Sequence, residues 1–230
     1  MEGYILISAL SKPFTIIIGH FGSGKTELSI AIAMQKKKEL QEAVTLVDMD
    51  IVNPYFRSSS QESSLQEAGI ELIKPQFAMT NVDIPILPAQ MQSIFTRNDT
   101  QVVIDVGGDE IGATALGRFY PAISAIRSKV QVLYILNPYR PFSSELETII
   151  PLYEAICSRS RLTPDYLIHN ANLQETTSAE DVISAFAITQ AASEKLGIPI
   201  GFTAGMPELA HCVPTPYFSF EPRMKPEWLQ

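Results

Sequence analysis

The sequence predicts a three-layer α/β/α fold with a mostly parallel central sheet. Short runs rich in β-branched residues alternate with longer helix-compatible stretches along the 230 residues, which is the pattern of repeated βαβ units. Hydrophobic residues make up 46% of the chain, which is enough for a sizeable buried core. Because no linker-like or low-complexity segment interrupts the alternation, we expect one domain over residues 1–230.

The first βαβ unit is the clearest in the sequence. Residues 14–18 are predicted to form a buried strand, residues 19–24 a glycine-rich turn, and residues 25–40 a helix. The helix prediction rests on the abundance of Ala, Leu, Gln, Glu and Lys, which all favour helices. A strand at 44–47 and a polar helix at 60–68 are predicted to follow.

The rest of the chain continues the alternation. The predicted strands are 70–73, 102–106, 130–136, 166–169 and 198–202, and the predicted helices are 85–95, 113–126, 143–158 and 179–196. The short apolar segment at 4–10 is predicted to be a strand or an edge segment. The tail from Val213 holds four prolines among apolar and aromatic residues, so we expect it to be irregular.

Charge and composition exclude several classes of protein. The formal net charge of -8 leaves no general basic footprint for nucleic acid or anionic lipid. The basic block Lys36–Lys38 is expected to be a solvated face at a helix end, where cations complement the helix dipole. No stretch approaches the ~20 apolar residues that span a bilayer. We therefore expect a cytoplasmic protein without direct nucleic-acid or membrane binding, whose cysteines, Cys157 and Cys212, are reduced.

A phosphate-binding loop is predicted between the first strand and helix. Residues 19–26, Gly-His-Phe-Gly-Ser-Gly-Lys-Thr, fit the pattern G-x-x-x-x-G-K-[ST] at every fixed position. Glycines let the backbone fold around a phosphate with its N–H groups inward, and the helix N-terminus adds positive potential. Lys25 is expected to reach the β- and γ-phosphates, and Thr26 to offer its hydroxyl to Mg²⁺. The predicted nucleotide contacts of this segment are Gly19, Phe21, Gly22, Ser23, Gly24, Lys25, Thr26 and Glu27.

Acidic residues at two strand ends support a nucleotide site. Asp48 and Asp50 are two residues apart, so strand alternation places both carboxylates on one side of the sheet's carboxyl edge. One could hold the water shell of Mg²⁺ and the other could position the attacking water. Asp105 follows an apolar run and has the form of a Walker B acid. Asp105 also begins a D-x-x-G pattern in which the Gly108 amide could contact the γ-phosphate as a switch.

In these motifs the chain resembles the MinD/ParA group of P-loop nucleotide-binding proteins. That group includes the nucleotide-binding domains of CobQ- and CobB-type amide synthases and dethiobiotin synthetase. The likeness rests on residues 19–26, on Val-Asp-Met-Asp ending at Asp50, on Val-Ile-Asp-Val-Gly-Gly at 103–108, and on Asn170-Ala-Asn. Segments 53–57 and 107–120 also look like an uncharacterised bacterial branch of the group.

The resemblance implies ATP and Mg²⁺ as cofactors and assigns roles to single residues. It places Lys25 on phosphate, and Thr26 on Mg²⁺. It also places Asp50 near the attacking water and Asp105 in the second shell of the metal, with Asp48 as a further metal candidate. Asn170 would lie on the adenine edge, since its amide offers the required donor and acceptor. On local grounds a turn role fits Asn170 equally well.

One position departs from the MinD/ParA pattern K-G-G-x-G-K-[ST]. In that group the early lysine reaches the phosphates of the partner subunit, whereas this chain has His20 and Phe21 where Lys-Gly would stand. Histidine is shorter and mostly neutral at pH 7, so it does not replace that cation. Arg57 could supply a compensating charge, or it could be an ordinary exposed loop arginine. The sequence leaves a homodimer open.

The leading functional hypothesis is an ATPase that acts as a nucleotide-controlled switch for a protein partner or for itself. Loops 50–57 and 105–112 would be ordered by the γ-phosphate and Mg²⁺. The alternative is an ATP-dependent enzyme on a small molecule, either a kinase or a carboxylate-activating synthase similar to dethiobiotin synthetase. Its substrate site could be lined by Arg118, Tyr120, Arg140 and residues 203–208. A GTPase that delivers metal is weaker, because the N-K-x-D motif and a Cys/His cluster are absent from the sequence.

Overall fold

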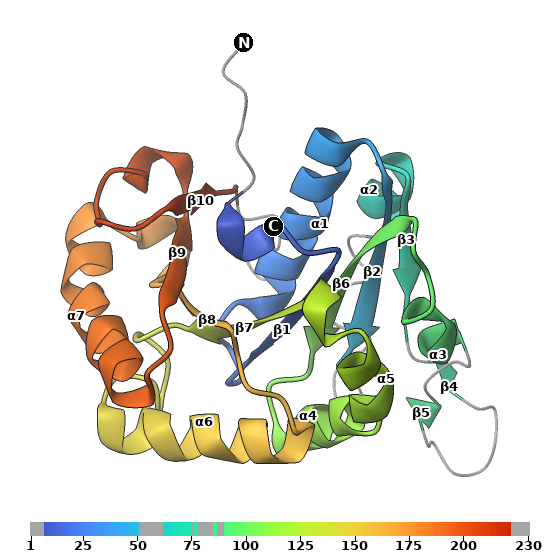
Figure 1. Ribbon diagram of the computed structural model, residues 1–230. Coiled ribbons are helices and arrows are strands. Elements are labelled where there is room, and N and C mark those ends of the chain that lie inside the picture. The colour runs from blue at the N-terminus through green and yellow to red at the C-terminus, as the bar shows by residue number, and fades with distance from the viewer. Residues whose placement is uncertain (1–6, 51–61, 75, 78–84, 87–89, 222–230) are drawn as a thin grey trace.

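The computed structural model describes residues 7–50, 62–74, 76–77, 85–86 and 90–221, which are arranged in three layers around a central sheet (Figure 1). The sheet has eight strands, all parallel, in the order β10-β9-β8-β7-β1-β6-β2-β3. Their bounds are β1 Phe14–Gly19, β2 Ala43–Met49, β3 Ile70–Ile73, β6 Thr100–Val106, β7 Val130–Leu136, β8 Tyr166–His169, β9 Ile200–Gly205 and β10 Tyr217–Ser219.

Helices cover both faces of the sheet (Figure 1). On one face lie α1 Lys25–Leu40 and α2 Glu62–Glu67, and on the other lie α3 Gln90–Ile94, α4 Glu110–Gly117, α5 Tyr120–Ala125, α6 Leu146–Ser160 and α7 Ala179–Leu196. Strand alternation feeds both layers, since Ile16 and Ile18 pack on the α4–α6 side while Ile17 packs against α1. Of the helices in the described ranges, none has both the length and the apolar character that a membrane span requires.

The strand order makes β1 the topological switch point of the sheet, where the chain changes from adding strands on one side to adding them on the other. β1 lies between β6 and β7, and the chain builds β6-β2-β3 on one side of it and β7-β8-β9-β10 on the other. In open α/β sheets, ligands bind outside the carboxyl ends of the strands at such a point. The fold therefore positions the loops after β1, β6 and β7 around one location.

Two predicted elements at the ends of the chain are wrong in type. The segment 4–10 is predicted to be a strand or an edge segment, but its described part forms a 3-10 helix at Ser8–Leu10, with Ala9 and Leu10 buried against the α1 side. The tail from Val213 was expected to be irregular, but Tyr217–Ser219 forms the edge strand β10 beside β9. Phe218 is buried in the same cluster as Phe202 of β9, so apolar packing at this strand outweighs the proline-rich composition around it.

Two predicted helices also differ from the structure. In place of a helix over 85–95, residues Pro85–Ile86 form β5, which pairs antiparallel with β4 Gln76–Phe77, and among the described residues of this stretch the helical ones are those of α3. Prolines at 85 and 88 disfavour a helix over this stretch. The predicted helix 113–126 is divided into α4 and α5, because Pro121 lies in the first turn of α5 and lacks the N–H that would continue α4.

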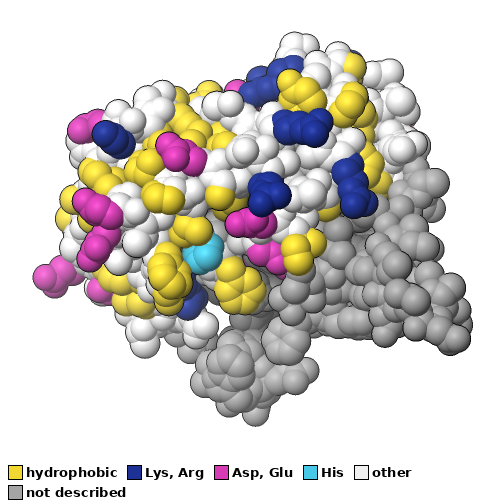
Figure 2. Space-filling view, turned by 90° about the horizontal axis from the view of Figure 1, so that it is seen from below, with side chains coloured by type: hydrophobic (Ala, Val, Ile, Leu, Met, Phe, Trp, Pro, Cys, Tyr) yellow, Lys and Arg dark blue, Asp and Glu magenta, His cyan; other side chains and the backbone are white. Residues whose placement is uncertain are grey.

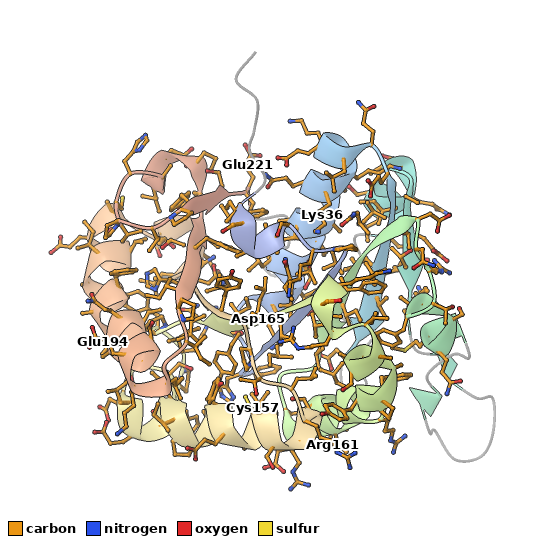
Figure 3. The ribbon with its side chains drawn as sticks, viewed as in Figure 1. Lys36, Cys157, Arg161, Asp165, Glu194 and Glu221 are labelled. Carbon is orange, nitrogen blue, oxygen red and sulfur yellow. The ribbon has the colours of Figure 1, made fainter. Side chains whose placement is uncertain are left out.

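Within the basic block at the end of α1, the predicted solvated face is wrong for Lys36, which is buried with 1% of its surface exposed, whereas Lys38 is exposed. Its ammonium donates to the Leu10 carbonyl at 3.0 Å, the Lys12 carbonyl at 2.8 Å and Gln101 Oε1 at 3.0 Å. Figure 3 shows Lys36 on α1 beside the start of the described chain. Burial lowers the pKa of Lys36 to about 8, with Glu42 opposing this effect, so the side chain stays charged at neutral pH. The lysine therefore ties α1 to the N-terminal segment and to β6.

A second buried polar residue, His169, joins β8 to α7. Its Nδ1 lies 2.7 Å from Thr189 Oγ1 and its Nε2 lies 3.1 Å from the Val182 carbonyl oxygen, while Phe186 packs edge-on against the ring. The carbonyl can only accept, so Nε2 carries the proton and Nδ1 accepts from the threonine hydroxyl. Burial lowers the pKa of His169 to about 4, with the Val182 hydrogen bond opposing this effect. The histidine is therefore neutral in the folded protein at pH 7.

This buried histidine predicts a loss of stability in mild acid. Since the pKa is lower in the folded than in the unfolded chain, the unfolded chain binds the proton first as the pH falls below about 6.5. Stability contributed by neutral His169 should be lost between pH 6.5 and pH 4, by roughly 3 kcal/mol in all. Urea unfolding of wild type and His169→Gln at pH 7.5, 6 and 5 measures this, with the variant showing the shallower pH dependence. Equal slopes for both proteins would contradict the assignment.

Candidate functional site

The glycine-rich loop joins β1 to α1 at the switch point. Gly24 caps α1 in the left-handed region at φ 90°, which favours glycine, and a side chain there would collide with the Asn170 amide. A hydrogen bond within the loop closes a turn, since the Ser23 N–H donates to the His20 carbonyl oxygen at 3.2 Å. The N-terminus of α1 follows directly, and a glycine-rich loop that leads into a helix N-terminus is the arrangement of an anion-binding site.

Lys25 and Thr26 begin α1 and both side chains are buried. Lys25 Nζ donates to the His20 carbonyl at 3.0 Å, and it lies so close to Gly108 that a Cβ on that glycine would be 2.6 Å away. The Thr26 hydroxyl acts on the Asp105 carboxylate at the end of β6, whose pKa it lowers. The structure thus brings the predicted lysine, threonine and Walker B aspartate together beneath the loop.

The three predicted acids also meet at this edge. Asp48 in β2 is the register partner of Asp105 in β6, and the Asp50 backbone N–H donates to Asp48 Oδ1 at 2.9 Å. Asp50 lies beside Gly107, with its Oδ1 3.3 Å from where a Cβ would stand on that glycine. Asp48 and Asp105 are buried, whereas Asp50 is half-buried. The acids therefore form a row from β2 to β6 beside the lysine.

The Asp105 environment fits a bound cation. Burial is the main cause that raises the pKa of Asp105, followed by the neighbouring Asp48, while Lys25 and the Thr26 hydroxyl oppose the shift, and the pKa reaches about 7. Its Oδ1 is buried without a hydrogen-bond partner. Among the described residues no three His, Cys, Asp or Glu side chains form a metal cage by themselves. Mg²⁺ does not need such a cage, because it usually combines one or two carboxylates with phosphates and waters.

Asn170, which follows β8, lies behind the loop. Its side chain is 1% exposed, Nδ2 donates to the Ser23 carbonyl at 2.7 Å, and Oδ1 is buried without a partner. The amide thus fastens the loop after β8 to the glycine-rich loop, which the sequence did not reveal. A contact between Asn170 and adenine stays a prediction.

The sequence missed the contribution of the loop after β7. Asn137 is buried, its Nδ2 donates to the Asn172 carbonyl at 3.1 Å, and its Oδ1 accepts from the Tyr139 N–H at 3.1 Å. This loop also carries Arg140, whose side chain packs against Gly22. The available signal was an asparagine directly after a buried strand, at the position that Asn170 holds after β8.

The remaining candidates lie in different surroundings. Phe21 in the loop is 52% exposed, and the His20 ring packs edge-on against exposed Phe142 at 6.2 Å between centroids. On the face seen in Figure 2, hydrophobic side chains flank a histidine. Burial, followed by Lys25, lowers the pKa of His20, which keeps it neutral. Arg118 is exposed at the far end of α4 from Gly108, and Arg57 lies outside the described residues, as does segment 51–57 of the first expected switch loop.

The close approach of Gly108 predicts a sensitive position. A methyl group there would lie 2.6 Å from Lys25 Nζ and 2.7 Å from the Phe21 backbone, so the loop or the lysine must move. We expect Gly108→Ala to weaken nucleotide binding by about tenfold or more, as measured by calorimetry. Gly197→Ala is the matched control: its Cβ meets nothing within 4 Å, and its φ of 68° costs about 1 kcal/mol of stability only. Unchanged affinity in Gly108→Ala would contradict this prediction.

Several solved structures share this fold. Chloroplast FtsY from Physcomitrella patens matches with a TM-score of 0.56 at 18% sequence identity, over 84% of this chain and 58% of that chain. Cell division protein FtsY from Thermotoga maritima gives 0.52 at 19% identity, over 84% and 61%. FlhF, crystallised with GTP/Mg(2+), gives 0.52 at 16% identity, over 85% and 66%. The chain therefore spans less than two thirds of the length of each of these proteins.

At such low identity these likenesses establish the fold and nothing finer. They confirm the predicted three-layer α/β/α architecture, whose all-parallel sheet matches these FtsY structures. No family model matches the sequence, and no curated protein matches it either. The specific resemblance to the MinD/ParA group stays a prediction.

Proposed function

We propose that this chain is a cytoplasmic Mg²⁺-dependent ATP-binding protein that hydrolyses ATP and acts as a nucleotide-controlled switch for a protein partner. The observation that carries the proposal is the meeting of Lys25, Thr26 and Asp105 beneath a glycine-rich loop at the switch point of the sheet. Lys25 and Thr26 come from the glycine-rich motif, and Asp105 comes from the acidic strand end. The arrangement offers a cation for phosphates and oxygen ligands for a hard metal ion.

The residues present suit the separate tasks of phosphoryl transfer to water. Lys25 would bind the β- and γ-phosphates, and the loop amides would surround them. Thr26 would ligate Mg²⁺, which neutralises charge on the phosphates when bound, and Asp105 and Asp48 would hold its water shell. Asp50, the least buried of the acids, would orient the water that attacks the γ-phosphorus as ADP leaves.

The loop after β6 supports a switch role. Gly107 and Gly108 join β6 directly to α4, whose first turn is capped by Asp109 accepting from the Gly112 N–H at 2.8 Å. Gly112 packs on Gly107 so closely that a Cβ would lie 2.6 Å from its carbonyl oxygen. A γ-phosphate that engages Gly108 would therefore shift α4. Ile111 in the first turn of α4 is exposed, so a partner protein that contacts it would sense this shift.

GTP is the second candidate nucleotide. The observation that supports GTP is the similarity in fold to FlhF, which was crystallised with GTP/Mg(2+). Guanine recognition by an N-K-x-D motif needs an aspartate that accepts from the base, and the segment after β8 reads Asn170-Ala-Asn-Leu. The absence of that aspartate from the motif position supports ATP.

Calorimetry with ATP, ADP and GTP, with and without Mg²⁺, tests the proposal together with phosphate release. We expect Mg²⁺-dependent ATP binding, slow phosphate release and little binding of GTP. Binding of GTP in preference to ATP would replace the nucleotide while keeping the site. No nucleotide binding by the folded wild-type chain would overturn the proposal.

A further inference from the structure

Arg140 approaches the glycine-rich loop from the side of β7, opposite the approach of Gly108 from β6. Its side chain lies along Gly22, with Cδ 3.6 Å and Nε 3.8 Å from the place a Cβ would take on that glycine. The guanidinium thus flanks the same loop whose other side holds Lys25. Since parallel strands end at one edge, both cations belong to one location.

The backbone around Arg140 is held in place by a dense set of hydrogen bonds. Arg140 N donates to the Asn137 carbonyl at 3.1 Å, and Ser143 N donates to the Arg140 carbonyl at 3.0 Å. The Tyr139 hydroxyl donates to the Asp181 carbonyl at 2.9 Å in the first turn of α7. Asn137 joins the same segment to the loop after β8. The arginine is therefore presented from a fixed scaffold, which favours a positioned contact.

The charge of Arg140 is not neutralised within the described part of the chain. The ion pairs found there involve Lys74, Arg97, Arg127 and Arg159, each with a carboxylate elsewhere in the fold. Arg140 Nε is buried without a hydrogen-bond partner. A buried donor without an acceptor is energetically unfavourable, and an incoming acceptor removes this penalty. An anionic acceptor is what an anion-binding loop brings to this place.

We propose that Arg140 donates to a phosphate oxygen of the nucleotide bound at the glycine-rich loop. This inference rests on the proposed function and names a further binding residue for it. Guanidinium donors match phosphate oxygens in charge and geometry, and such charge-assisted hydrogen bonds are among the stronger ones in proteins. Arg140 and Lys25 then hold the phosphate chain from two sides of the loop.

Two substitutions separate charge from packing. Arg140→Met keeps an apolar stem against Gly22 but removes the donor, and Arg140→Lys keeps the charge. We expect the affinity for Mg·ATP, measured by calorimetry, to fall about 10- to 100-fold in Arg140→Met and clearly less in Arg140→Lys. Lys195→Met, which removes an exposed cation from the last turn of α7, should leave the affinity unchanged.

The outcomes distinguish this inference from the proposed function. If wild type binds no nucleotide, the proposed function fails and takes the inference with it. If wild type binds nucleotide and both Arg140 variants bind it as tightly as wild type, only the inference is wrong. Equal losses in both variants, with a lowered melting temperature in the absence of nucleotide, would show a packing role and also overturn it.

Discussion

Replacing Lys25 with alanine should lower the affinity for Mg·ATP by about 100-fold or more while the chain stays folded. Lys25 Nζ is buried beneath the loop, between the His20 carbonyl and Gly108, where a phosphate can take over as its partner. A charge-assisted contact to two phosphates contributes more than one ordinary hydrogen bond, and here it is shielded from water. Calorimetry measures the loss, and circular dichroism shows whether the fold is kept.

The control for this variant is Lys195→Ala, which removes one positive charge from the exposed last turn of α7. It should bind nucleotide as wild type does. If Lys25→Ala also kept the wild-type affinity in a folded protein, then the lysine would not contact phosphate and the predicted role of the loop would be wrong.

The second large effect is expected at Lys36, where methionine should destabilise the fold by about 2–4 kcal/mol. Methionine fills a similar volume but leaves the Leu10 and Lys12 carbonyls and Gln101 Oε1 without their shared donor. Buried acceptors that lose a charged partner cost more than a surface substitution does. Urea unfolding at pH 7 measures the difference from wild type.

Lys195→Met is the matched variant for stability, and it should change the free energy of unfolding by less than about 0.5 kcal/mol. A loss of less than 0.5 kcal/mol in Lys36→Met would contradict the three hydrogen bonds as a stabilising junction. Nucleotide affinity should be similar in both variants, because Lys36 lies near the opposite end of α1 from the loop.

Helices with clear end signals were predicted to the residue. The helix 179–196 matches α7, whose start carries a capping box between Ser178 and Asp181 and whose end is capped by left-handed Gly197. The helix 25–40 matches α1, because the motif fixes its start. Local chemistry decides these boundaries, so a single sequence contains them.

Elements decided by distant contacts could not be predicted. Lys36 lies in a run of three lysines that resembles a solvated face, and only the packing of residues 10–12 and 101 over α1 buries it. The edge strand β10 exists because Phe218 packs on Phe202, a contact that composition does not encode. Both depend on which segments become neighbours in the fold.

The candidate site divides in the same way. Lys25, Thr26 and Asp105 were predicted together, because each lies in a recognisable sequence pattern: the glycine-rich motif for the first two and an acid after an apolar run for the third. Asn137 and the placement of Arg140 were missed, because their importance depends on β7 lying beside β1, which the order of elements along the chain does not state. Once the strand order is known, every loop at this edge becomes a candidate.

The most direct test of the account is an NMR titration of the wild-type chain with Mg·ATP. We predict that the amide resonances of residues 22–26 and 108 shift with saturation, while those of Lys195 and Gly197 at the C-terminal end of α7 do not. Shifts confined to the cavity of about 410 Å³ at the opposite end of the sheet, lined by Lys37, Glu71 and Arg97 among others, would contradict the account. So would the absence of any shift in the folded protein.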